Sequence, residues 1–148
     1  ETFLVAATVQ MVATTLRDLM QEKKLTAETL FAELNGGKAD GKIDEGTFVA
    51  FLEKLPKTVS REDLMFTSTR RKAIFHQVDV DKDDAVSFTD FQELLRVRYV
   101  CISGISATDN FEVANSKTIS KIEVGDVVEA LGNPRRDSNT GMRRVECQ

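Results

Sequence analysis

Carboxylates recur at alternate positions in one polar segment, which runs from Asp79 to Asp90 over twelve residues. Asp79, Asp81 and Asp83 occupy its first, third and fifth positions. Side chains at alternate positions of a tight loop can converge on one point, and carboxylate oxygens are ligands that Ca²⁺ and Mg²⁺ prefer. The spacing therefore predicts a divalent-cation site in this segment.

Three further residues complete the predicted set of ligands. The backbone carbonyl of Ala85 stands at the seventh position, the hydroxyl of Ser87 at the ninth and the carboxylate of Asp90 at the twelfth. Val86, at the eighth position, is apolar. The alternative that needs no ion is a solvated acidic loop in which Ser87 and Asp90 cap the following helix.

An internal repeat surrounds this segment. Ile43 and Val86 are 43 residues apart, and so are Phe48 and Phe91. The repeating unit is helix, loop, helix. Together with the loop spacing, residues 75–95 resemble an EF-hand, and the repeat makes the first half resemble its paired partner. The resemblance covers about residues 26–98 and implies a calcium-binding module.

The segment departs from the EF-hand pattern at two positions. Asp84 stands at the sixth position, where the family has a glycine in a turn that needs a positive φ. Asp90 stands where the family has a glutamate that binds with both oxygens. Aspartate is one methylene shorter than glutamate, so Asp90 is not expected to bind an ion with both oxygens. The loss of a bidentate ligand lowers the affinity for Ca²⁺ and shifts the preference towards Mg²⁺. We therefore expect Ca²⁺, with Mg²⁺ as the alternative ion.

The first loop, residues 35–47, is expected to be free of metal. It holds one residue more than the second loop, and Asn35 and Asp40 are weak substitutes for the early carboxylates. Lys38 adds a positive charge, and Thr47 takes the place of the closing glutamate. Its expected role is to place Ile43 opposite Val86 in a short antiparallel bridge. The alternative is an atypical site built from backbone carbonyls.

Helical periodicity and cap residues organise the first hundred residues. An apolar stripe predicts a helix over residues 2–23, and Thr26 is the expected N-cap of the next helix. A third helix is predicted to end just before Pro56. Ser60, with an acidic residue three positions later, is typical of a capping box that begins a fourth helix.

The last third of the chain is predicted to be built from strands. Residues 111–113 alternate in polarity, and Gly125 and Asn133 mark turns. Residues 121–129 resemble the start of a small SH3-like β-barrel. We therefore expect an α+β chain: an EF-hand pair with an extra N-terminal helix over residues 1–99, then a small, incomplete antiparallel β module over residues 100–148.

Composition excludes several classes of function. Twenty basic and 24 acidic residues give a net charge of −4, which argues against a nucleic-acid-binding protein. No run of about 18 apolar residues predicts a membrane span. Cys101 and Cys147 do not make a disulfide framework, so reduced thiols in an intracellular, cytoplasmic protein are expected. The first residue, Glu1, and the strand-like end suggest a piece of a longer polypeptide.

No catalytic set can be assembled from the sequence, so we do not expect an enzyme. His76 is the only histidine and has no cysteine cluster near it. The functional hypothesis is a cation-binding regulatory or scaffold module that contacts a protein partner or other domains of the same polypeptide. The alternatives are a metal-independent structural or interaction subunit with a degenerate loop, and a regulatory piece of an enzyme whose catalytic residues lie elsewhere.

Overall fold

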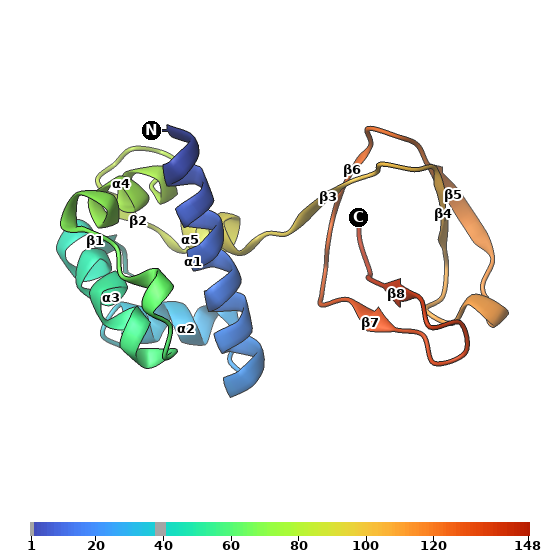
Figure 1. Cartoon of the computed structure of the whole chain (residues 1–148), viewed down its shortest axis with the longest axis horizontal. Coiled ribbons are helices and arrows are strands. Elements are labelled where there is room, and N and C mark those ends of the chain that lie inside the picture. The colour runs from blue at the N-terminus through green and yellow to red at the C-terminus, as the bar shows by residue number, and fades with distance from the viewer. Residues whose placement is uncertain (1, 38–40) are drawn as a thin grey trace. The chain divides into compact units, whose positions relative to one another are not determined.

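The computed structural model describes residues 2–37 and 41–148, and it divides the chain into two compact units, residues 1–95 and 96–148. The described α-helices all lie in the first unit, and the second is built from short strands (Figure 1). The α+β class predicted from the sequence is confirmed. The division lies close to the boundary expected at residue 99.

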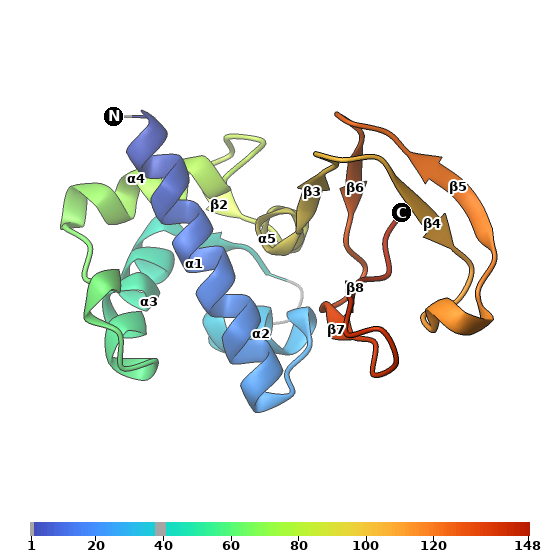
Figure 2. The same ribbon diagram turned by 45° about the vertical axis from the view of Figure 1, so that its right-hand side comes forward.

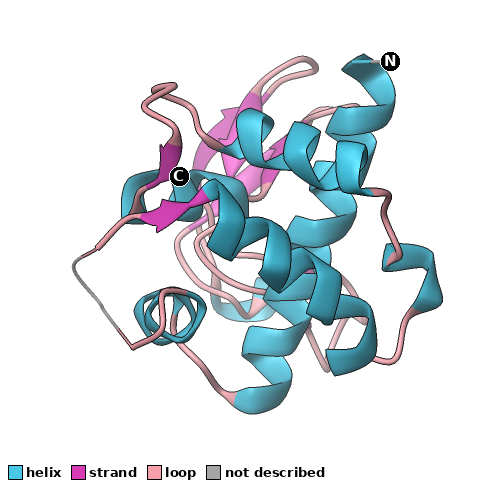
Figure 3. Cartoon of the chain, turned by 90° about the vertical axis from the view of Figure 1, so that its left-hand side faces the viewer, coloured by secondary structure: helices cyan, strands magenta, loops and turns pink. Residues whose placement is uncertain are grey.

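The first unit is mainly helical (Figure 3). Its elements are α1 (Thr2–Lys23), α2 (Ala27–Leu34), β1 (Ile43–Asp44), α3 (Glu45–Thr58), a 3₁₀ turn (Glu62–Leu64), α4 (Ser68–Val78), β2 (Ala85–Val86) and α5 (Phe88–Leu95). The order helix, short strand, helix thus occurs twice after α1, as the internal repeat predicts.

Local sequence sets both ends of α2. The Thr26 hydroxyl accepts a hydrogen bond from Thr29 N–H at 3.2 Å, so the predicted N-cap is confirmed. At the other end, Gly36 and Gly37 have positive φ angles of 65° and 89°. Gly37 N–H donates to Ala32 O at 2.6 Å, which closes the helix in the way that glycine makes easy.

Two predicted helix boundaries were wrong. Pro56 lies inside α3, near its C-terminal end. Ser60 ends this helix instead of beginning the next one: it has a φ of 54°, and Arg61 N–H reaches back to Pro56 O at 2.9 Å. The cap of α4 is Thr67, whose hydroxyl accepts from Arg70 N–H at 3.2 Å.

In the core, phenylalanines of one repeat pack against phenylalanines of the other. Phe31 of α2 lies 5.5 Å, between ring centroids, from Phe91 of α5. Phe48 of α3 lies 5.8 Å from Phe75 of α4. Each entering helix therefore packs on the exiting helix of the other repeat. All four rings are buried, and the two repeats therefore share one hydrophobic core.

Helix α1 covers this pair of repeats. It packs against α4 and α5 (Figure 1) and buries Val12, Ala13 and Leu16. By length and composition alone, residues 3–23 are also long and apolar enough to cross a membrane. Since part of this helix is buried in the core of the unit, the described residues contain no clear membrane span.

The second unit is a bent β-ribbon with a hairpin. Its elements are β3 (Arg98–Val100), β4 (Ile105–Thr108), a 3₁₀ turn (Val113–Asn115), β5 (Thr118–Ile122), β6 (Val127–Glu129), β7 (Arg135–Arg136) and β8 (Arg143–Arg144). The antiparallel pairs are β3–β6, β4–β5 and β7–β8. Figure 2 shows the ribbon curving between the first two pairs. The last residues extend it, because Ala130 pairs with Cys147.

Burial differs sharply between the units. Every buried apolar residue of the described chain lies in the first unit. Within residues 96–148, all of which are described, Asp137 is the only buried residue. The strand predicted over residues 111–113 was wrong, because Phe111 lies in a bend and Val113 begins a 3₁₀ turn. The SH3-like resemblance stays a prediction.

Candidate metal site

A short antiparallel bridge holds the two loops of the first unit side by side. Ile43 pairs with Val86, and Asp44 pairs with Ala85. The side chains of Ile43 and Val86 are both buried. The predicted pairing of Ile43 with Val86 is confirmed, and it fixes the base of the acidic loop against the core.

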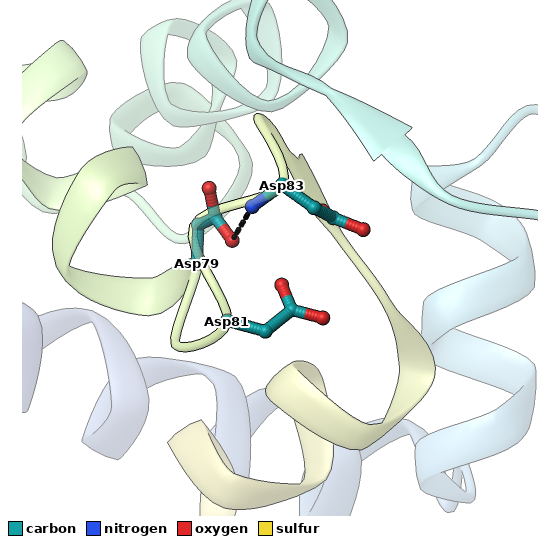
Figure 4. Close-up of side chains that lie close together, drawn as sticks. All are labelled: Asp79, Asp81 and Asp83. Atoms are coloured by element: carbon teal, nitrogen blue, oxygen red, sulfur yellow. Dashed lines mark hydrogen bonds between the residues drawn. The ribbon is translucent and has the colours of Figure 1, made fainter.

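The acidic loop brings its first three carboxylates together. Asp79, Asp81 and Asp83 each offer an oxygen within 4.8 Å of the others. Figure 4 shows these side chains, with the Asp81 carboxylate directed into the loop. Asp79 is 3% exposed, whereas Asp81 and Asp83 are exposed to solvent. The arrangement offers oxygen ligands to a hard cation from one accessible side.

Asp79 also organises the loop backbone. Its two carboxylate oxygens accept hydrogen bonds from Asp83 N–H at 3.2 Å and Asp84 N–H at 2.9 Å. Asp84, at the position where an EF-hand has glycine, has a φ of 63°. Aspartate tolerates this left-handed conformation better than most residues do. The turn that glycine usually makes is therefore formed without it.

The remaining predicted ligands have bonds within the loop. Ser87 N–H and Oγ donate to Asp90 Oδ2 at 2.9 and 2.6 Å, and Asp90 N–H donates to Ser87 Oγ at 3.2 Å. This is the helix-capping arrangement of the alternative interpretation. Asp90, which is 5% exposed, also accepts from Val80 N–H at 3.3 Å and so closes the loop. Ala85 donates its N–H to Asp83 Oδ1 at 3.1 Å.

Lys42 of the first loop reaches the acidic cluster, which the sequence reasoning did not foresee. Its ammonium group forms an ion pair with Asp83 Oδ2. The hydrogen bond raises the pKa of Lys42 and lowers the pKa of the Asp83 carboxyl. Asp81 differs, because reduced solvation and the neighbouring Asp83 charge raise the pKa of its carboxyl. Asp81 is thus a carboxylate of the cluster whose ionised form is disfavoured.

The described residues of the first loop offer fewer carboxylate ligands than the acidic loop does. Asp40 and Lys38 lie outside the described residues. Gly41 lies so close to the Asn35 amide that an added Cβ would come within 2.5 Å of its nitrogen. Thr47 N–H donates to Asp44 Oδ1 at 2.7 Å, so Thr47 lies in the first turn of α3 and Asp44 caps that helix. That bond lowers the pKa of the Asp44 carboxyl.

The other sequence candidates have structural partners. His76 Nε2 lies 3.5 Å from Glu45 Oε2. Cys101 Sγ donates to Ser103 O at 3.1 Å, and Cys147 forms an isolated antiparallel bridge with Ala130. Both cysteines are free thiols. Neither they nor His76 lie in the group of carboxylates that could hold an ion.

Comparison with known proteins identifies no relative of this chain. The chain matched no protein-family model, no curated protein and no solved structure.

Proposed function

We propose that the Asp79–Asp90 loop binds a divalent cation, Ca²⁺ or alternatively Mg²⁺, within an EF-hand-like pair. The observation that carries the proposal is the convergence of Asp79, Asp81 and Asp83 oxygens within 4.8 Å. The bridge between the two loops and the left-handed turn at Asp84 support it. Asp79, Asp81 and Asp83, with the Ala85 carbonyl, Ser87 and Asp90, would hold the ion.

The module acts in this proposal as a regulatory or scaffold part of a larger intracellular protein, and not as an enzyme. An ion that joins α4 to α5 through their shared loop would order both helices and the core between them. Its partner would be another protein or another domain of the same polypeptide. A single competent loop favours local ordering over a large opening transition, and no methionine-rich groove is apparent from the four methionines.

A metal-independent structural module is the second candidate. Two observations favour it: Lys42 neutralises Asp83, and the Ser87–Asp90 cap is complete without an ion. In this alternative the acidic loop is a helix cap and an ion-pair partner for the first loop. The two candidates differ in one respect that can be measured, the response of the loop to added cation.

Calorimetric titration of the cation-free chain tests the proposal. Addition of Ca²⁺ or Mg²⁺ should give saturable heat, and amide hydrogen exchange in residues 79–90 should slow relative to the protein in chelator. The amides of residues 96–148 serve as an internal control and should not change. Absence of heat and of protection up to millimolar concentrations of both ions would favour the metal-independent module.

A further inference from the structure

In the β7–β8 hairpin of the second unit, two pairs of like charges lie directly opposite each other. Its register places Arg135 opposite Arg144 and Arg136 opposite Arg143. Like charges directly opposite each other destabilise a strand pair. In two strands of only two residues each, this cost needs a compensating interaction for each pair.

For the Arg135–Arg144 pair, contacts within the second unit offset the repulsion between the two like charges. The guanidinium carbon of Arg135 lies 4.3 Å from the centroid of the Phe111 ring. Arg144 donates to Asn110 O at 3.1 Å, and also to Phe111 O and Thr108 Oγ1. These contacts hold the hairpin against the end of β4 and the segment after it, so the Arg135–Arg144 pair has a structural role.

The other pair has no anionic partner. Arg136 donates to Gly141 O at 3.0 Å, a neutral acceptor. Across the described residues, no carboxylate lies within ion-pair distance of Arg136 or Arg143. The adjacent Asp137 is buried, and its oxygens accept from the N–H groups of Val113 and Asn139. Its carboxylate oxygens are therefore already bonded to backbone N–H groups within the second unit.

Alternation along the strands places Arg136 and Arg143 on the face opposite to Arg135 and Arg144. Both are exposed. Directly opposed residues have Cβ atoms about 5 Å apart, and each guanidinium presents a planar fork of donors that fits an oxyanion. A phosphate monoester carries a charge of about −1.5 to −2 near neutral pH, which matches the two positive charges. A single carboxylate would neutralise only one of them.

We propose that the outward-facing Arg136–Arg143 pair binds a phosphate monoester dianion. The ligand would be a phosphorylated side chain of a protein or a small phosphate ester. This inference does not depend on the cation site, because it concerns a different unit.

Three probes test the proposal on the isotope-labelled full chain by nuclear magnetic resonance: inorganic phosphate, a phosphoserine tripeptide and its unphosphorylated form. Saturable shifts of the Arg136 and Arg143 side-chain signals with the first two, and not with the third, are expected. Tighter binding of the phosphopeptide would point to a protein source, and equal binding to a small phosphate ester.

Matched variants separate the site from general charge attraction. Arg143→Gln is the cleanest change, because among the described residues this exposed side chain makes no hydrogen bond or ion pair that the substitution would remove. Arg136→Gln is the second. Each should weaken binding about tenfold or more. The control Lys117→Gln/Lys121→Gln removes two exposed charges from the same unit and should leave affinity nearly unchanged. Equal weakening in the control, no saturable shift, or equally tight binding of the unphosphorylated peptide would overturn the proposal.

Discussion

Replacement of Asp81 by asparagine distinguishes a cation site from a helix cap. Asp81 is exposed, and the pKa of its carboxyl is raised by reduced solvation and by Asp83. A group whose folded pKa is raised stabilises the fold at low pH, and this contribution is lost as pH rises through the folded pKa. At neutral pH the ionised carboxylate is therefore unfavourable. Without cation, Asp81→Asn should be at least as stable as the parent chain.

The same change should have the opposite effect when cation is present. An ion at about 100 times its Kd stabilises a folded protein by about 2.7 kcal/mol. Asp81 supplies one of three converging carboxylates, so its loss should lower the affinity for the ion by about tenfold or more. A tenfold higher Kd would remove about half of the stabilisation at the same ion concentration. The variant thus gains or keeps stability without cation and loses it with cation.

Asp84→Asn is the matched control. It removes one negative charge from the same loop, and asparagine also tolerates the positive φ of this position, but Asp84 lies outside the converging cluster. Thermal unfolding followed by helical circular dichroism reports the first unit, because all described α-helices lie there. Fluorescence would not serve, since the only tyrosine is Tyr99 of the second unit and there is no tryptophan. If Asp81→Asn keeps the full cation-induced shift of the control, the assignment of the site is refuted.

Three further predictions follow from single contacts. Lys42→Met removes the ammonium group that competes for Asp83, so calorimetry should show cation affinity raised about two- to fivefold; unchanged or weaker affinity would contradict this. Phe31→Ala removes a fully buried ring and should lower the free energy of unfolding of the first unit by about 3–5 kcal/mol in denaturant titrations, whereas Phe3→Ala, at an 83% exposed side chain, should change it little. Hydrogen bonds from Val113 and Asn139 N–H lower the pKa of Asp137 from its ordinary value of 3.8, so its stabilising effect is present above that value and is lost as pH falls towards the lower folded pKa. Resonances of the β7–β8 hairpin should lose dispersion over that acid range in the parent chain, and Asp137→Asn should abolish this pH dependence.

Local sequence predicted the helices well where each end depends on nearby residues. The hydroxyl of Thr26 and the glycines after α2 act within a few residues of where they stand, so their effect can be read from the chain. Ser60 shows the limit of such reading. A serine followed by an acidic residue resembles a cap, but here the backbone of residues 60–61 closes the preceding helix onto Pro56. The same residue types can thus stand at the end of one helix or at the start of the next, and the sequence pattern alone does not distinguish the two.

Contacts between distant segments were harder to predict. The alternate aspartates of the second loop indicated their own convergence, because that geometry is local. Lys42 and Asp83 are 41 residues apart, and only the register of β1 and β2 brings them together. Asp137 was missed for another reason. A buried aspartate that holds a turn through backbone N–H groups looks in sequence like an ordinary polar residue.

The partners of each carboxylate predict which contact a bound cation must break. A carboxylate has about four lone-pair sites, so Asp79 and Asp90 can keep their backbone hydrogen bonds and still coordinate an ion. Lys42 cannot remain beside a dication in the same way, because two positive charges on Asp83 would repel each other. If the proposed site is correct, binding therefore releases the Lys42 side chain while the rest of the loop keeps its bonds. The position of the Lys42 side chain in the first loop, which need not bind metal itself, would then depend on whether the second loop holds an ion.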